Sequence, residues 1–257
     1  MFFNPNRTSL RTLLPVVATV LACGAPVAAQ AATAKTAPKA VKVARNPCIG
    51  YPQITTVAAF NDGKYGSGIK VWAEPKETEQ PKHTIGVGIE VKGRPTFNVM
   101  ATEGDWYRVR VPVRPNGAEG YVRKQDVTTY QHPWTIVVEL GRRELTVCNG
   151  GRVVQVEKVG VGKSSAPTPT GNCFTADLIK QRNPKGGYGP FAYGLSCFSD
   201  TVFSFGAGGD GRLGIHGTNV PGALGTAVSS GCIRVGNNGI TKMAKTLPLG
   251  VPVFIVN

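Results

Sequence analysis

Short runs of alternating apolar and polar residues recur along most of this chain, and they constrain its fold more than any other feature. In "DWYRVRV" the residues Tyr107, Val109 and Val111 recur at every second position, which is the period of a half-buried strand. The 257 residues include 33 glycines and 19 prolines, which separate such runs by turns and disfavour long helices. We therefore expect a mainly β protein.

Single segments add detail to this expectation. Asn149-Gly150-Gly151 predicts the turn of a β-meander, and "TVFSFGAGG" (201–209) and "GRLGIHGT" (211–218) each resemble a short strand. Helical spacing is convincing only near the C-terminus, where Asn237-Asn238 is a candidate cap and Pro248 a stop. The apolar residues with this spacing are Ile240, Met243, Ala244 and Leu247. One or two short helices are expected in all.

The first 31 residues have the features of a secretory signal peptide. Arg7 and Arg11 precede an apolar core of 17 residues, and Ala29-Gln30-Ala31 is a plausible cleavage site. An alternative is a lipoprotein signal, in which Cys23 is lipidated and tethers the protein to the membrane. No other stretch is apolar and long enough to cross a bilayer. We expect an exported protein of the periplasm or cell wall, with a flexible linker over residues 32–50.

Two domains are expected after the linker, at residues 51–130 and 131–257. The phrase "GDWYRVRV…GAEGYVRKQDV" in the first resembles the bacterial SH3-like domain, which implies a small barrel that binds or positions on the cell wall. A spacer without a ligand is the alternative. The net charge of +14 comes from scattered basic residues, which argues against nucleic acid and allows anionic wall polymers, lipid headgroups or simple solvation.

Cysteine counting leaves one thiol without an obvious partner. Of the six cysteines, Cys23 lies in the signal, so five remain in the mature chain. In an oxidising compartment four of them can form two disulfides in three connectivities. The mature cysteines are Cys48, Cys148, Cys173, Cys197 and Cys232. The count alone does not identify the free one.

His216 and Cys232 are a candidate catalytic pair. His216 ends an apolar run, and Cys232 follows sixteen residues later, enough for a loop that returns a strand beside the first. A histidine within hydrogen-bonding reach raises the thiolate fraction of a cysteine and carries its proton. A strand-end histidine and an inert buried cysteine stay open as alternatives. A zinc site is poorly supported, because no Cys-x-x-Cys pair exists.

"IHGT" followed by "SSGCIR" resembles the signature of the L,D-transpeptidases with a YkuD-type catalytic domain. That signature reads H-G-T, a loop of similar length, and S-x-G-C-I/V/L-R/N. "TPTG" at 168–171, "YGPFAYGLS" at 188–196 and the closing "PLGVPVFIV" are also similar to this domain. The resemblance covers roughly residues 133–257. It implies a β-rich catalytic domain that needs no metal or organic cofactor.

The resemblance implies a role for each matching residue. Cys232 is expected as the nucleophile, His216 as its base, and the Gly217 carbonyl as the group that orients the imidazole. No acidic third member is expected. The remaining motif positions are expected to bind substrate or its oxyanion or to shape the site: Ser230, Gly231, Arg234 and Thr218. Ser230 departs from many family members, which have a second histidine there, so His216 alone must activate the thiol.

The implied reaction is acyl transfer on peptidoglycan. Cys232 attacks the third residue of a tetrapeptide stem, releases D-alanine and passes the acyl group to an amine, which cross-links third residues. A carbapenem is the expected covalent inhibitor. The alternatives are an L,D-carboxypeptidase, another wall cysteine hydrolase, or a non-catalytic secreted wall-binding protein. With Cys232 as nucleophile, we favour a Cys173–Cys197 disulfide around the substrate loop and Cys48–Cys148 as the second.

Overall fold

Strands are the main secondary structure of the computed structural model, which describes residues 45–60, 68–86, 94–204 and 209–257. The predicted signal peptide and Cys23 lie outside these residues. Within the described ranges no helix is both long and apolar enough to cross a membrane. The described residues all belong to one compact unit.

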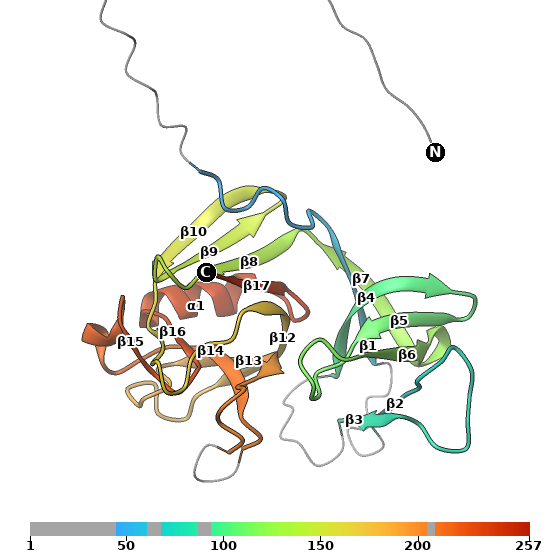
Figure 1. Cartoon of the computed structure of the whole chain (residues 1–257). Coiled ribbons are helices and arrows are strands. Elements are labelled where there is room, and N and C mark those ends of the chain that lie inside the picture. The colour runs from blue at the N-terminus through green and yellow to red at the C-terminus, as the bar shows by residue number, and fades with distance from the viewer. Residues whose placement is uncertain (1–44, 61–67, 87–93, 205–208) are drawn as a thin grey trace, which may run out of the picture. The chain divides into compact units, whose positions relative to one another are not determined.

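A five-stranded antiparallel sheet occupies the segment predicted as the first domain. Its strand order is β6-β5-β4-β1-β7, and a separate hairpin pairs β2 with β3 (Figure 1). The predicted alternation in β5 is confirmed, since Val109 is fully buried in an apolar cluster that Tyr107 also contacts. The strands are β1 (Thr55–Phe60), β2 (Ile69–Val71), β3 (His83–Ile85), β4 (Thr96–Glu103), β5 (Trp106–Arg110), β6 (Glu119–Arg123) and β7 (Val127–His132). A 3-10 turn, Lys124–Asp126, precedes β7.

An eight-stranded mixed sheet forms the second half of the chain. Its order is β10-β9-β8-β17-β12-β13-β14-β16, so the C-terminal strand inserts between β8 and β12. The strands are β8 (Trp134–Glu139), β9 (Glu144–Asn149), β10 (Arg152–Lys158), β12 (Gly171–Lys180), β13 (Phe191–Phe198), β14 (Arg212–His216), β16 (Ile233–Arg234) and β17 (Pro252–Val256). A small parallel pair joins β11 (Val161–Gly162) to β15 (Ala227–Ser229). Gly150 and Gly151 make the predicted β9–β10 turn with positive φ.

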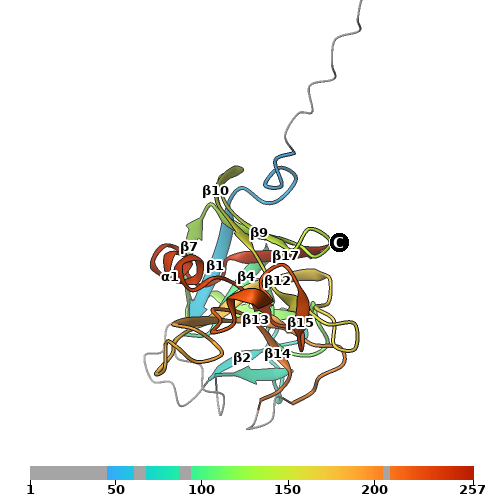
Figure 2. The ribbon, with the colours of Figure 1, turned by 90° about the vertical axis from the view of Figure 1, so that its left-hand side faces the viewer.

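One face of this sheet carries α1 (Asn237–Thr246), the single α-helix of the described residues (Figures 1 and 2). Its apolar residues Ile240 and Met243 are buried in the main core with Tyr193 and Ile215. The Tyr193 hydroxyl donates to the Met243 carbonyl at 3.1 Å, which joins the helix to β13. The opposite face of β13 and β14 is therefore left for the site.

Two local predictions are wrong. Thr201–Ser204 forms no strand, because the Ser199 hydroxyl accepts the N–H groups of Thr201 and Val202 at 3.3 and 3.0 Å and holds a turn. The rest of that predicted strand includes 205–208, outside the described residues. The N-cap of α1 is Gly236, and Asn237 is the first helical residue.

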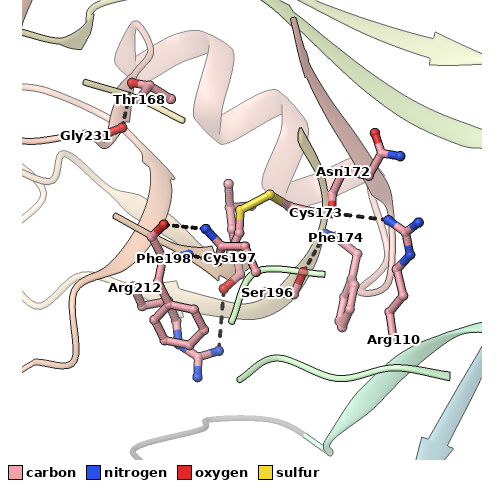
Figure 3. Close-up of a disulfide and its surroundings, with 12 residues drawn as sticks. Arg110, Thr168, Asn172, Cys173, Phe174, Ser196, Cys197, Phe198, Arg212 and Gly231 are labelled. Carbon is pink, nitrogen blue, oxygen red and sulfur yellow. Dashed lines mark hydrogen bonds between the residues drawn. A yellow bond between two sulfur atoms is a disulfide. The ribbon is translucent and has the colours of Figure 1, made fainter. Parts of the chain in front are cut away.

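Both expected disulfides are present. Cys48 bonds to Cys148 and Cys173 to Cys197, while Cys232 is the free cysteine of the described chain. Figure 3 shows the second bond between β12 and β13, with Phe174 N–H donating to the Ser196 hydroxyl beside it. The first ties the segment before β1 to β9.

Removing the Cys48–Cys148 bond should destabilise the protein strongly. The bond joins residues 100 positions apart, so a Cys48→Ala/Cys148→Ala variant is expected to lose about 2–4 kcal/mol of unfolding free energy. The loss is mainly loop-closure entropy regained by the unfolded chain. Urea unfolding without reductant measures it. The Cys173→Ala/Cys197→Ala control, whose bond spans 24 positions, should lose about 1 kcal/mol less. Equal urea midpoints for wild type and the first variant would contradict this account.

Candidate active site

The pairing of β14 with β16 brings His216 and Cys232 together. These strands are parallel, with Ile215 opposite Ile233 and His216 opposite Arg234. Cys232 immediately precedes β16, so this register sets it opposite Gly214. Because alternate residues of a strand share a face, the side chains of His216 and Cys232 lie on the same side of the sheet.

Gly214 forms the floor between the two side chains. A Cβ placed on it would lie 4.0 Å from the Cys232 Sγ and 4.0 Å from the His216 Cδ2. It would also lie 3.0 Å from the Tyr193 carbonyl oxygen, closer than Cβ atoms normally approach. The thiol and the imidazole therefore border one small space, which any larger residue at position 214 would fill.

The orientation of the His216 ring is set by its neighbours. Nδ1 lies 2.6 Å from the Gly217 carbonyl oxygen and donates its proton to it, the contact that the family resemblance implies. This tautomer leaves Nε2 unprotonated, as a base requires. The Tyr188 ring packs on the imidazole with the ring centroids 4.6 Å apart.

Burial controls the protonation of both groups. Desolvation lowers the pKa of His216 to about 4, opposed by the Gly217 hydrogen bond and assisted by the Arg234 charge. His216 is therefore neutral at pH 7. Burial also raises the pKa of the Cys232 thiol, although a backbone hydrogen bond from Gly214 and the Arg234 charge both lower it. At neutral pH the pair is a thiol beside a neutral imidazole, so a thiolate forms only when the proton moves to His216.

Acid should destabilise the folded protein through His216. Its folded pKa of about 4 lies below the usual value, so between pH 6.5 and 4 the unfolded chain binds the extra proton. The unfolding free energy is fully retained above about pH 6.5 and falls by roughly 3 kcal/mol towards pH 4. Urea unfolding of wild type and His216→Gln at pH 7.5 and 4.5 measures this. An equal loss in both proteins would refute it.

The loop before Cys232 is held by side chains from two other segments. Ser229 Oγ donates to the Cys232 carbonyl at 2.6 Å and accepts the Gly231 N–H at 3.1 Å. Thr168 Oγ1 donates to the Gly231 carbonyl at 2.7 Å and accepts the Gly162 N–H at 2.9 Å (Figure 3). Gly231 has a φ of +114°, and a Cβ there would lie 2.9 Å from Leu213, so glycine is required.

The other expected site residues surround this loop. Ser230 is exposed, Thr218 is buried, and Arg234 follows the nucleophile with its Nε buried and without a hydrogen-bond partner. The Gly231 N–H is engaged by Ser229, which differs from its expected place among the oxyanion donors. In the described ranges no three His, Cys, Asp or Glu side chains come together as a metal site.

Sequence reasoning missed Asn237 as a site residue. Its side-chain oxygen accepts the Thr218 N–H at 2.9 Å and so fixes the segment after His216. A Cβ on Gly217 would lie 2.4 Å from this oxygen, which explains the glycine in "HGT". Asn237 stood out in the sequence only as a candidate cap, because nothing local links it to a residue 19 positions earlier.

Tyr188 connects the pair to a neighbouring cavity. This cavity has a volume of about 500 Å³ and is lined by residues from Ile179 to Asn183 and from Gly186 to Tyr188. The Tyr188 ring forms part of its wall and also contacts His216. The cavity therefore lies next to the His216 imidazole.

Comparison with known proteins identifies relatives of this half of the chain. Residues 133–255 match the family model YkuD, described as the L,D-transpeptidase catalytic domain. The YkuD protein of Bacillus subtilis (strain 168), provisionally named an L,D-transpeptidase, is 37% identical over 126 residues, which cover 49% of this chain and 68% of that protein.

Solved structures also match. A C442S mutant of the Enterococcus faecium L,D-transpeptidase is 19% identical, with a TM-score of 0.37, over 48% of this chain and 49% of that one. The match thus spans about half the length of that chain. The L,D-transpeptidase LdtMt1 in complex with imipenem is 14% identical, with a TM-score of 0.41, over 79% of this chain and 82% of that one.

Proposed function

This chain is an enzyme of the L,D-transpeptidase family with a YkuD-type catalytic domain, and we propose that it cross-links peptidoglycan stems through a cysteinyl acyl-enzyme. The observation that carries the proposal is the free thiol of Cys232 beside His216 across the Gly214 floor. The expected substrate is a tetrapeptide stem that ends in D-alanine.

In the acylation step Cys232 Sγ attacks the carbonyl carbon of the third stem residue. His216 Nε2 takes the thiol proton as the C–S bond forms, and it returns that proton to the leaving nitrogen of D-alanine as the peptide bond breaks. The product is a thioester. An acceptor amine then attacks the thioester, loses a proton to His216, and the proton returns to the sulfur as the new amide leaves.

Backbone groups are proposed to stabilise the oxyanion of both steps. Since Gly231 N–H is engaged by Ser229, this role falls to the N–H groups of Ser230 and Cys232. Arg234 supports the reaction through its charge, which lowers the pKa of the thiol. Thr218, held by Asn237, contributes to the substrate wall.

The N-terminal half is proposed to be an SH3-like module that positions the enzyme on its wall substrate. Its five-stranded antiparallel sheet and hairpin are compatible with a small barrel. Export by a signal peptide, or a lipid tether at Cys23, would deliver the protein to the periplasm or cell wall. A carbapenem is proposed as a covalent inhibitor, because its ring contains a strained carbonyl that the Cys232 thiol can attack.

Incubation with tetrapeptide-bearing muropeptides tests the proposal. Release of D-alanine together with a cross-linked dimer supports transpeptidation, whereas D-alanine with a tripeptide stem alone indicates the carboxypeptidase alternative. No release at any protein concentration would favour a non-catalytic wall-binding protein. Intact-protein mass spectrometry after carbapenem treatment provides a second readout of thiol acylation.

A further inference from the structure

Asp177 carries a buried carboxyl group, one oxygen of which has no hydrogen-bond partner. The residue lies on β12 and is only 6% exposed, and its Oδ1 makes no hydrogen bond among the described residues. The nearby Arg212 guanidinium turns elsewhere, donating to the carbonyls of Leu195 and Pro112 at 3.5 and 3.3 Å. Burial raises the pKa of Asp177, an effect that Arg212 only partly offsets. Native proteins rarely retain such a group without a use for it.

A β-bulge aims this carboxyl at the face of the nucleophile. Thr175 pairs with Leu195, yet Asp177 pairs with Gly194, so the register shifts by one residue between them. Without the shift, Asp177 would lie opposite Tyr193 and face the core beneath α1. Bulges of this kind re-aim side chains and occur often beside active sites.

A row of two glycines connects Asp177 to Cys232. Asp177 is opposite Gly194, Gly194 is opposite Gly214, and Gly214 lies beside the Cys232 sulfur. The first three residues lie on the neighbouring strands β12, β13 and β14, and Cys232 immediately precedes β16, the next strand of the sheet (Figure 1). Both glycines are partly exposed, and the Arg212 side chain borders the row, with its Cδ 3.7 Å from the Cβ position of Gly194. A Cβ on Gly194 would lie 3.2 Å from Asp177 Oδ2 and would close the row.

The distance along this row fits a long side chain. Opposite Cβ positions lie about 5 Å apart, and the Gly194 and Gly214 positions are 3.2 Å from Asp177 Oδ2 and 4.0 Å from Cys232 Sγ. The carboxyl and the sulfur are therefore at most about 12 Å apart. An extended chain from the sulfur through an acylated carbonyl to the nitrogen of a lysine-length side chain spans roughly 9 Å, because bonds near 1.5 Å follow a zigzag. A charge-assisted hydrogen bond of about 2.8 Å covers the rest.

We propose that Asp177 binds the ammonium group at the end of the third-residue side chain of the donor stem, so that the enzyme selects stems with a diamino acid there. The inference rests on the proposed function, in which Cys232 acylates at that residue. The positions of Gly194 and Gly214 lie between the carboxyl and the thiol, so Asp177 is not placed at the reacting atoms. Asp177 is thus a binding residue for the donor.

Two synthetic tetrapeptide stems test this inference, identical except for lysine or Nε-acetyllysine at the third position. Wild type should release D-alanine from the lysine stem with a kcat/KM at least about tenfold higher. Asp177→Asn should lower the lysine rate until the two stems differ less than about twofold. Gly194→Ala, which crowds the carboxyl, should reduce the preference in the same direction. Asp105→Asn is the matched control, because Asp105 is exposed in the turn between β4 and β5 and lies outside the row.

The ratio of the two rates distinguishes binding from folding damage. A misfolded variant loses activity on both stems in parallel, whereas loss of the proposed contact lowers only the rate on the lysine stem. Equal rates on both stems by active wild type, or a preference that Asp177→Asn and Gly194→Ala both retain, would overturn this inference alone. Failure of wild type to act on either stem would count against the proposed function and this inference together.

Discussion

Replacing Cys232 with alanine is expected to abolish D-alanine release, with a loss of at least about 10⁴-fold. The expectation follows because the other four cysteines of the described chain are held in two disulfides, so Cys232 is the free thiol among these residues. Alanine removes the sulfur but keeps the backbone N–H groups. Fold and peptide binding should therefore persist.

Two measurements check this prediction. One is the rate of D-alanine release from tetrapeptide muropeptides, and the other is the mass of the intact protein after carbapenem treatment. Val228→Thr provides a control of similar shape, since Val228 is 47% exposed on the strand that precedes the nucleophile. A carbapenem adduct or D-alanine release that survives Cys232→Ala would refute the assignment of the nucleophile.

Replacing His216 with glutamine should lower kcat/KM for acylation by roughly 10²–10⁴-fold, the usual contribution of a positioned general base. Glutamine keeps a polar side chain of similar size but cannot take the thiol proton. The loss should be large here, because burial raises the pKa of Cys232 and leaves little thiolate without a base. No second histidine adjoins the nucleophile, since Ser230 occupies that position.

The pH profile gives this prediction a second readout. In wild type, kcat/KM should decrease as the pH drops through about 4, where His216 becomes protonated and can no longer act as a base. In His216→Gln this decrease near pH 4 should be absent, and the residual rate should rise with pH as the thiol ionises. His83→Gln is the control, because His83 lies on the separate β2–β3 hairpin. An unchanged profile in His216→Gln would show that another group activates the thiol.

The local features of the fold could be read from the residues. Alternation in β5, the Asn149-Gly150-Gly151 turn and the spacing of α1 each follow from contacts between near neighbours in the chain. The failures were also local. The segment at Thr201–Ser204 contains a β-type pattern, but its backbone N–H groups donate to the Ser199 hydroxyl, which holds the segment in a turn. The SH3-like nature of residues 51–130 stays a prediction.

The sequence by itself determined the chemical partners of the proposed reaction. After the predicted signal it contains one cysteine more than two disulfides need, and a histidine lies sixteen residues before Cys232. These features depend on residue type and spacing, which the chain carries directly.

Tertiary structure alone decided how those partners are arranged. Gly214 is the floor under the thiol and the imidazole only because β14 and β16 pair in parallel with one register. Asn237 reaches Thr218 from the start of α1, and a bulge in β12 turns Asp177 towards the nucleophile's face. Strand register and bulges arise from pairing between distant segments, and a shift of one residue reverses every side chain. No local pattern in the sequence specifies that choice.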